Sequence, residues 1–210
     1  MKGEYKLSIE QLRKELEEIK QELQGPQVVG HFEKVSFKQF LKDFNKDGKL
    51  TEEEVLKVYE DILVLPKRAS VDSAGYDFVL TKDITLKPGE SVEILTGIRS
   101  KIKRGWVLLL APRSGLGSKF RLQINNTIGV IDGDYYEAEN EGHIKATITN
   151  DSNENKTLEL KAGDRFIQGF FVPYGIIEGD NVTAKRTGGY GSSGLSSFET
   201  KKEPEQLTFF

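Results

Sequence analysis

The sequence lacks cysteine altogether, and this absence excludes disulfides, thiolate-bound zinc and a cysteine nucleophile. Histidine is scarce as well. His31 and His143 are the only two, so a metal centre built from several histidines is excluded. Basic residues are not in excess, because 30 Lys and Arg stand against 33 Asp and Glu, for a net charge of −3. The composition therefore carries no electrostatic signature of nucleic-acid binding.

Long hydrophobic runs are also missing. The longest, Trp106 to Ala111, is far too short to cross a bilayer, and the charged segment Met1 to Glu10 has no apolar signal-peptide core. Hydrophobic residues make up 37% of the 210 residues and charged residues 30%, which is typical of a globular protein. We expect a soluble, cytoplasmic protein with one core-forming domain and some extensions.

An amphipathic helix is predicted within residues 1–25. Its apolar positions recur at spacings of 4, 3 and 4, at Leu12, Leu16, Ile19 and Leu23. Ser8, with Gln11 three residues later, fits a capping box, and Gly25 followed by Pro26 ends the helix. Because the apolar seam covers only about two heptads, the helix either packs on its own domain or joins a coiled coil.

Residues 26–65 are predicted to form a strand followed by a helix-loop-helix insertion, with a loop at 43–54 that fits the EF-hand pattern. In that pattern the calcium ligands are Asp43, Asn45, Asp47, Lys49, Thr51 and Glu54. The alternative is a helix-turn-helix. There Asp47 and Gly48 form the turn, Thr51 caps the second helix and Glu54 completes a capping box.

From residue 66 onward, short apolar stretches alternate with Gly, Pro and Asn turns, roughly every 8–12 residues. The stretches lie at 83–86, 91–95, 106–110, 143–148 and 166–172. This spacing is typical of a sandwich or barrel, so a β core is predicted over residues 66–182. A glycine-rich segment at 183–195 and a polar tail at 196–210 follow.

Five glycine-rich or polar segments of this region suit a nucleoside triphosphate: residues 74–77, 112–117, 126–135, 163–168 and 186–194. Their small-residue loops could cradle phosphates with backbone amides and hydroxyls. Arg113 and Arg186 could bind phosphate in a bidentate manner, and Gln168 adds a neutral donor.

Acidic and aromatic residues of the same segments suit a metal-assisted reaction on a nucleotide. Asp77, Asp132 and Asp134 could hold hydrated Mg²⁺ and activate water, and Tyr190 could stack on a base. The P-loop pattern is absent, which argues against an ordinary kinase or GTPase. No histidine stands in a triad setting, which argues against a serine hydrolase.

Taken together and in this order, the five segments resemble the five motifs of trimeric dUTP diphosphatases (dUTPases), from about Leu65 to Gly194. The resemblance implies a mainly β subunit with the dUTPase jelly roll (β-clip) and a homotrimer with active sites shared between subunits. It also implies Mg²⁺-assisted hydrolysis of dUTP to dUMP and pyrophosphate, which keeps uracil out of DNA and supplies dUMP for dTMP synthesis. The nearest branch is that of phage and Firmicute enzymes, which implies the cytoplasm of a bacterium or a phage-infected cell.

The resemblance also assigns roles to the third segment. Asp132 corresponds to the general base that orients water for attack on the α-phosphorus. Asn126 and Gly129 belong to the hairpin that reads uracil, and Tyr135 packs under the deoxyribose and leaves no room for a ribose hydroxyl. Asp77, of the first segment, supports Mg²⁺ through water.

By the same resemblance, two sets of residues hold the triphosphate. Arg113, Ser114 and Gly115 contact the α- and β-phosphates, and Gln168 contacts the α-phosphate. The second set lies in a flap donated by a neighbouring subunit: Arg186, Tyr190, Gly191, Ser192 and Ser193. There Arg186 reaches the γ-phosphate, Tyr190 stacks over uracil and the serines close on the phosphates.

The third segment departs from the family pattern after Tyr135. The family usually continues with Arg-Gly, whereas an acidic stretch, residues 136–142, follows here. This departure predicts a longer hairpin with altered local geometry.

The last five residues resemble the peptide with which bacterial replication proteins bind the sliding clamp. The matching positions are Gln206, Leu207, Phe209 and Phe210. Apolar anchors on a charged tether suit such docking, and the alternative is a tail that folds back on its own trimer.

Two other functions stay open at this point. A dCTP deaminase or bifunctional relative would release ammonia from dCTP. A nucleotide-gated regulatory protein would bind dUTP without turnover.

Overall fold

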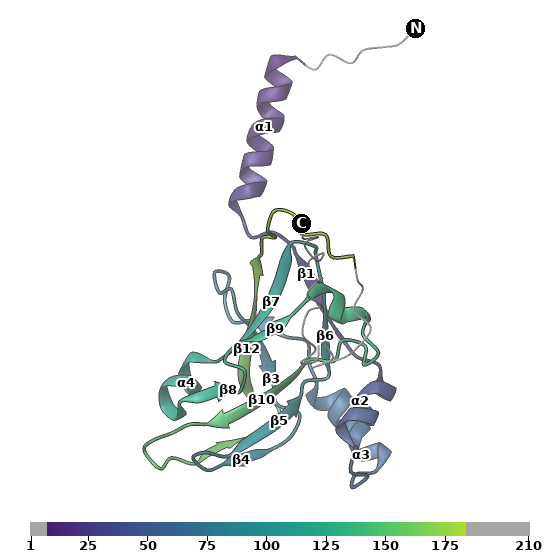
Figure 1. The fold of residues 1–210 in the computed structure, drawn as a ribbon, viewed down its shortest axis with the longest axis vertical. Coiled ribbons are helices and arrows are strands. Elements are labelled where there is room, and N and C mark those ends of the chain that lie inside the picture. The colour runs from purple at the N-terminus through teal and green to yellow at the C-terminus, as the bar shows by residue number, and fades with distance from the viewer. Residues whose placement is uncertain (1–7, 184–210) are drawn as a thin grey trace, which may run out of the picture.

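Four antiparallel sheets build the body of the molecule in the computed structural model, which describes residues 8–183, without the side chains of residues 21–24 (Figure 1). The largest has the strand order β2 (Lys67–Arg68), β3 (Tyr76–Val79), β12 (Arg165–Pro173), β7 (Trp106–Pro112) and β9 (Gly129–Ile131). A second has the order β5 (Ser91–Leu95), β10 (Lys145–Asn150) and β8 (Leu122–Ile124). Two strand pairs complete the set: β1 (Gly30–Lys34) with β6 (Ile98–Ile102), and β4 (Ile84–Leu86) with β11 (Leu158–Leu160). The predicted mainly β class is confirmed, and the packed sheets are consistent with a jelly roll.

Burial alternates along the strands of the second sheet. Ala146, Ile148 and Asn150 of β10 are buried, and the residues between them are only half-buried. Successive side chains of a strand point to opposite faces, so this period of two turns one face of each strand to the interior. The predicted stretches at 83–86, 91–95, 106–110, 143–148 and 166–172 overlap the strands β4, β5, β7, β10 and β12.

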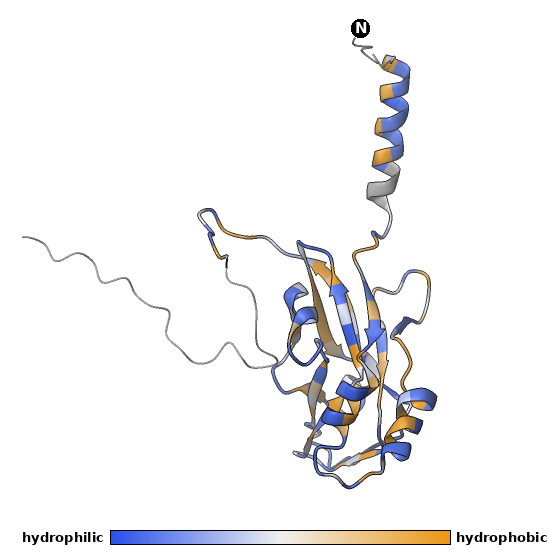
Figure 2. Cartoon of the chain, turned by 90° about the vertical axis from the view of Figure 1, so that its right-hand side faces the viewer, coloured by the Kyte–Doolittle hydropathy of each residue, from blue (hydrophilic) through white to orange (hydrophobic). Residues whose placement is uncertain are grey.

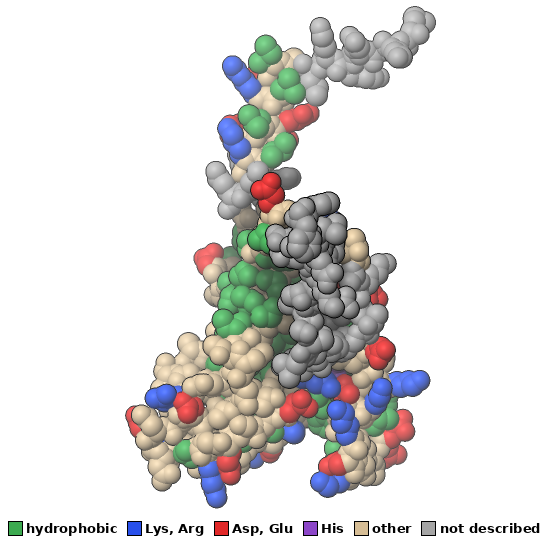
Figure 3. Space-filling view, in the orientation of Figure 1, with side chains coloured by type: hydrophobic (Ala, Val, Ile, Leu, Met, Phe, Trp, Pro, Cys, Tyr) green, Lys and Arg blue, Asp and Glu red, His purple; other side chains and the backbone are tan. Residues whose placement is uncertain are grey.

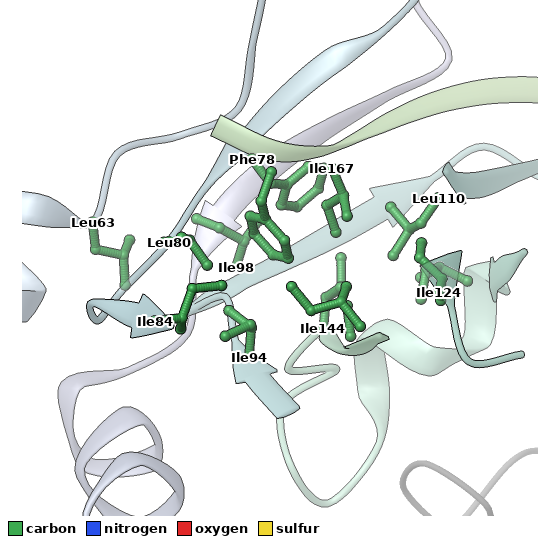
Figure 4. Packing of buried hydrophobic residues seen from close by; sticks show 14 of the residues in the cluster. Leu63, Phe78, Leu80, Ile84, Ile94, Ile98, Leu110, Ile124, Ile144 and Ile167 are labelled. Atoms are coloured by element: carbon green, nitrogen blue, oxygen red, sulfur yellow. The ribbon is translucent and has the colours of Figure 1, made fainter. Parts of the chain in front are cut away.

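The core lies between the sheets and joins strands that are distant in the sequence. Figure 4 shows Phe78, Leu110 and Ile167 of the five-stranded sheet together with Ile94 and Ile124 of the second sheet. Each of these side chains is at most 3% exposed. Burial of a side chain of this size contributes about 1.5–3 kcal/mol, so this contact between sheets holds the body together.

The amphipathic helix is present as α1 (Ile9–Gln24). The predicted capping box is confirmed, because Ser8 Oγ accepts from the backbone N–H of Gln11 (3.2 Å) and Gln11 Oε1 accepts from that of Ser8 (2.8 Å). The helix ends at Gly25, as predicted. It projects away from the body and presents an apolar stripe along one side (Figures 1 and 2).

The insertion between β1 and β2 folds as α2 (Phe37–Phe44), α3 (Glu52–Lys57) and a π-helical turn at Val58–Ile62. Phe40, Val55 and Leu63 are at most 1% exposed and belong to the core cluster. Leu63 lies directly over Gly97, where a Cβ would come within 1.8 Å of its Cδ1. The insertion is therefore packed into the interior and closes it on one side.

The loop at 43–54 takes the helix-turn-helix form rather than that of a calcium loop. Gly48 makes the turn with a φ of +65°, and Thr51 caps α3. The Glu54 carboxylate accepts from the backbone N–H of Thr51 (2.7 Å), which completes the capping box.

The acidic residues among the six predicted calcium ligands do not form a cluster in the described part of the chain, and calcium binding by this loop stays a prediction. Asp43 turns into the interior and contacts His143 at 2.7 Å. Asn45 Oδ1 accepts from the backbone N–H of Leu50, and Asp47 pairs with Lys49 at 2.8 Å. Because local caps and a core contact use the same acidic residues, the EF-hand pattern alone did not determine a metal site.

Two short helices complete the fold. They are α4 (Ser114–Phe120), directly after β7, and the 3₁₀ turn η2 (Gly133–Glu137), directly after β9. Across residues 8–183, no helix has the length and apolar character needed to cross a membrane.

Candidate active site

Three predicted site residues lie on or beside the central strands of the five-stranded sheet. Gln168 on β12 is in register with Asp77 on β3 and with Ala111 on β7. Arg113 follows β7, and its backbone N–H donates to the Phe166 carbonyl (3.2 Å). The sheet thus gathers three of the predicted segments, 74–77, 112–117 and 163–168, at one end of β7.

Asp77 is held between two arginines. Arg113 Nε lies 2.9 Å from Oδ1, and Arg165 Nη1 lies 3.0 Å from Oδ2. The Asp77 side chain is only 11% exposed, and partial burial strengthens such ion pairs. Asp77 therefore fixes the guanidinium of Arg113. Sequence reasoning gave Arg165 no role, and its place in the fourth segment is its only signal.

Gln168 occupies space that the glycine of the first segment leaves open. A Cβ at Gly75 would lie 2.5 Å from Gln168 Oε1. Gln168 Nε2 donates to the Pro112 carbonyl at 3.3 Å. The amide is thereby placed next to the loop that begins at Arg113, and a larger residue at position 75 would displace it.

Ser114 and Gly115 begin α4, with Arg113 as the N-cap. The Arg113 carbonyl accepts from the N–H groups of Leu116 and Gly117 (3.0 and 2.9 Å). The first N–H groups of a helix have no acceptor within the helix, so those of Ser114 and Gly115 can donate to an anion beside Arg113.

The segment with Asn126 and Gly129 connects two sheets, because β8 belongs to the second sheet and β9 to the largest. Thr127 adopts a left-handed φ of +67°, and the N–H of Ile128 donates to the Asn126 carbonyl (2.7 Å). Asn126 is exposed at the tip. Gly129 lies against Leu110, whose Cβ would be 3.0 Å from an added Cβ. This tight, exposed turn can present backbone groups to a planar ligand.

Asp132 and Tyr135 lie at the η2 turn. Asp132 is exposed, and its carbonyl accepts from the Tyr135 N–H (3.2 Å). Tyr135 is only 3% exposed, and its hydroxyl donates to the His143 carbonyl (2.8 Å) and accepts from Asn140 (2.7 Å). The ring predicted to pack under the sugar is therefore held firmly by the core.

Asp132 and Arg113 lie at opposite ends of β7. Ile131, directly before Asp132, pairs with Leu108, whereas Arg113 follows Pro112 at the other end of the strand. At roughly 3.3 Å per residue, the strand separates the residue facing Asp132 from Arg113 by about 20 Å. Within one chain, the predicted base and the predicted phosphate-binding residues thus lie apart, as two separate half-sites.

The acidic stretch after Tyr135 contacts the strand pair β1–β6. The Tyr136 hydroxyl donates to Glu33 Oε2 (2.8 Å), which also accepts from Arg99 (2.8 Å). Hydrogen bonds from Tyr136, His31 and Arg99 together lower the pKa of Glu33 to about 2. The arginine also lies over the Tyr136 ring, 4.1 Å from its centroid. Tyr136 thus anchors this stretch where the family usually has arginine.

The same stretch also docks on α2. The Glu141 carboxylate accepts from the backbone N–H and the hydroxyl of Ser36 (2.7 and 2.6 Å) at the start of α2. His143 contacts Asp43, and both side chains are buried. Sequence reasoning placed His143 in no site, and no local pattern signals it, because its partner lies 100 residues away. The acidic stretch after Tyr135 and the insertion between β1 and β2 are therefore packed against each other.

The residues predicted to support Mg²⁺ do not form a cage of protein ligands. The Asp77 carboxylate contacts two guanidinium groups, and within the described part of the chain no three acidic or histidine side chains gather as a metal site. Mg²⁺ in nucleotide enzymes is usually held by phosphates, water and only one or two carboxylates. A magnesium ion beside Asp77 would therefore need a nucleotide and water to supply most of its ligands.

The predicted flap residues, from Arg186 to Ser193, and the predicted clamp-binding peptide, from Gln206 to Phe210, lie outside the described residues.

Comparisons with known proteins agree on one family. A family model described as dUTPase matches residues 62–197. The deoxyuridine 5′-triphosphate nucleotidohydrolase of Lactococcus lactis subsp. lactis (strain IL1403) is 38% identical over 145 residues, which are 67% of this chain and 95% of that protein. The enzyme of the same name from Nautilia profundicola is 34% identical over 145 residues, covering 67% of this chain and 96% of its own.

A solved structure gives the same result. The crystal structure of dUTPase from Streptococcus mutans superposes with a TM-score of 0.53 at 34% identity, covering 71% of this chain and 99% of that chain. The family match over more than half of the sequence and the identity to named relatives lead to one conclusion: the chain belongs to the dUTPase family.

Proposed function

We propose that this protein hydrolyses dUTP to dUMP and pyrophosphate, at sites that different copies of the chain complete together. The separation of Asp132 from Arg113 along β7 carries this proposal. The base must lie near the α-phosphorus, and the arginine must hold the phosphates of the same nucleotide. A second copy that places its Arg113 end beside the first copy's Asp132 would complete the site, as in a cyclic homotrimer. Family membership and the named relatives support dUTP as the substrate.

Asp132 is the proposed general base. Its carboxylate takes a proton from water as the water oxygen bonds to the α-phosphorus. The bond from that phosphorus to the bridging oxygen breaks, and pyrophosphate leaves with the electron pair. The exposed position of Asp132 at the end of β9 is open to a water molecule and a nucleotide.

Asn126, Gly129 and Tyr135 are the proposed nucleoside-binding residues. The tight turn at 126–129 would offer backbone donors and acceptors to the uracil edge, which a cytosine does not match. The Tyr135 ring, fixed by its hydroxyl bonds, would pack under the deoxyribose. A rigid ring excludes a ribose 2′-hydroxyl, because the core holds the ring in place.

Arg113, Ser114, Gly115 and Gln168 are the proposed contacts of the α- and β-phosphates. Asp77 positions the arginine, and Gly75 positions the glutamine. The flap residues would complete the phosphate and base contacts: Arg186, Tyr190, Gly191, Ser192 and Ser193. Mg²⁺ bound to the triphosphate would neutralise its charge, with Asp77 as the residue that supports the ion through water.

The sequence of the tail supports one further partner. Leu207, Phe209 and Phe210, after Gln206, offer three apolar anchors of the kind that sliding-clamp peptides carry. We expect the full chain to bind a bacterial clamp in a pull-down and Leu207→Ala to lose that binding. If Leu207→Ala and the unchanged chain are retained equally, the C-terminal peptide does not bind the clamp.

The first experiment measures pyrophosphate release from dUTP, dCTP, dTTP and UTP with Mg²⁺. We expect turnover of dUTP alone, and loss of that turnover in Asp132→Asn, whose amide keeps the shape of the side chain but accepts no proton. Ammonia release from dCTP would indicate a deaminase instead. Binding of dUTP by a folded protein without turnover would indicate a nucleotide-gated regulatory protein.

A further inference from the structure

Helix α1 exposes an apolar stripe that the body of the molecule does not cover. The stripe consists of Ile9, Leu12, Leu16 and Ile19, whose exposed fractions are 72%, 50%, 51% and 52%. Figure 2 shows it along one side of the helix, and Figure 3 shows charged side chains beside it. Packing of α1 on its own domain, one of the two alternatives, is therefore not what the structure shows.

The stripe has the spacing of a coiled-coil seam. With Ile9 as heptad position a, Leu12 is d, Leu16 is the next a and Ile19 the next d. A helix of 16 residues with about two heptads is marginal alone in water, so its stability must come from a partner. Of the two intrahelical ion pairs, Lys14–Glu18 lies on the outer face, whereas Glu17–Lys20 includes Lys20, which flanks the seam.

The charges beside the seam identify the partner. In this register Arg13 and Lys20 occupy e positions, and Glu15 occupies the g position between them. In a parallel, in-register pair, a g residue faces the e residue of the next heptad on its neighbour, so Glu15 faces Lys20 of another copy. In an antiparallel pair, e positions face e positions, which would set basic residues against each other. The charges thus complement a parallel copy of the same helix.

A membrane surface fits less well. Interfacial helices carry mostly Lys and Arg on their polar face, whereas Glu outnumbers the basic residues in α1. The seam is also narrow, since each of its residues is still flanked by charged side chains. A narrow seam with acids on one flank and bases on the other is typical of helix pairing.

We propose that α1 binds the α1 helices of other copies of this chain in a short parallel coiled coil. The core trimer proposed above would supply the high effective concentration that so short a seam requires. The number of helices follows from that trimer, whereas orientation and register rest on the residues of α1 alone.

The absence of cysteine from the chain allows a clean test by disulfide cross-linking of the full-length protein. Leu12→Cys places a thiol at a seam position, and Lys14→Cys places one on the outer face two residues later. Under a glutathione redox buffer, Leu12→Cys should form covalent dimers several-fold faster than Lys14→Cys. In an antiparallel pair centred on the seam, residue 12 would face residue 16 of the other copy. The two introduced cysteines would then be about one helical turn apart, too far for a disulfide. Equal rates for the two variants would therefore overturn the proposal.

Charge exchange tests the register in the Leu12→Cys background. Glu15→Lys and Lys20→Glu should each slow cross-linking, because like charges then face each other across the pair. The double variant should restore the rate, because the two positions again carry opposite charges. A double variant as slow as the singles would overturn the predicted pairing. Hydrolysis of dUTP measured on the same samples reports on the proposed function separately, since none of these residues lies at the active site.

Discussion

The Nδ1 atom of His143 lies 2.7 Å from Oδ2 of Asp43, and the two side chains are 0% and 6% exposed. His143 Nε2 accepts from the backbone N–H of Gly97 (2.8 Å), so the ring hydrogen is on Nδ1 and the imidazole is neutral. The charge partner of Asp43 is therefore Lys145, whose Nζ lies 3.5 Å from Oδ1. This buried group joins the insertion to the segment that positions Tyr135, because the Tyr135 hydroxyl bonds the His143 carbonyl.

Removal of the Asp43 carboxylate should destabilise the whole domain. Asp43→Ala leaves a buried imidazole N–H and a largely buried ammonium without their acceptor, which costs about 3 kcal/mol. Urea unfolding at pH 7 measures the loss. The matched control is Asp61→Ala, an exposed position of the same insertion, with an expected change within about 0.5 kcal/mol. Similar losses of unfolding free energy in Asp43→Ala and Asp61→Ala would contradict a stabilising role of the buried Asp43 carboxylate.

The same carboxylate should make stability depend on pH in acid. Burial raises the pKa of Asp43, but hydrogen bonds from His143 and Gln39 and the charge of Lys145 outweigh it, so the pKa lies below its usual value. A group with a lowered pKa in the folded state stabilises above its unfolded pKa, and this contribution is lost as the pH falls below about 4. Wild-type unfolding free energy should therefore fall more steeply than that of Asp43→Asn below pH 4. If the two proteins lose unfolding free energy equally as the pH falls, the Asp43 carboxylate does not cause the acid dependence.

Tyr136 should control the ionisation of Glu33. Its hydrogen bond is the largest of the effects that lower the pKa of Glu33 to about 2. Tyr136→Phe removes this donor, so the pKa should rise toward the ordinary glutamate value. Carboxyl NMR titration measures the shift, and Tyr174→Phe, at an exposed tyrosine, serves as the control. An unchanged Glu33 titration in Tyr136→Phe would refute the assignment.

Gly75→Ala should reduce activity with little effect on folding. The new methyl group would meet the flexible end of Gln168, which can move aside at small cost to stability. Displacing Gln168, a proposed phosphate-binding donor, should lower kcat/KM for dUTP on the order of tenfold. Gly25→Ala, where nothing lies within 4 Å of the added Cβ, should leave activity unchanged. Full activity of Gly75→Ala would indicate that Gln168 does not contribute to phosphate binding.

Mixed trimers test whether the half-sites come from different copies. Asp132→Asn and Arg113→Ala should each be inactive alone, because each lacks one half-site. When the two are unfolded and refolded together, about a quarter of the sites should combine an intact Asp132 with an intact Arg113 from different chains. Recovered dUTP hydrolysis is the expected result. If mixing restores nothing, each chain must build its site alone.

Local patterns predicted the secondary structure well, because caps and strand periods depend on neighbouring residues. The Ser8–Gln11 capping box and the strand at 106–110 are confirmed on these grounds. The loop at 43–54 could not be predicted in the same way. Its spacing satisfies both a calcium loop and a capped helix-turn-helix, and the contact of Asp43 with His143, which is distant in the sequence, belongs to neither local pattern.

The candidate site also has features that a local pattern predicts and features that depend on residues distant in the sequence. The loop proposed to bind phosphate was visible in the sequence as a glycine-rich segment, but the contact of Arg165 with Asp77 was not, since it follows from the pairing of β12 with β3. Likewise, the distance between Asp132 and Arg113 depends on the register of β7 and β9. Such relationships arise from strand pairing and are not contained in any single motif.

The contact between Leu63 and Gly97 bears on how short this protein can be made. Excision of residues 36–63 would trim the chain toward the length of its relatives, and it would also uncover a hollow floored by Gly97 and leave His143 without Asp43. The remaining residues offer no side chain at position 97 to fill that space, because Leu63 and Phe40 occupy it in the intact protein. Residues 36–63 look like an insertion in the sequence, yet in this protein they close the hydrophobic interior.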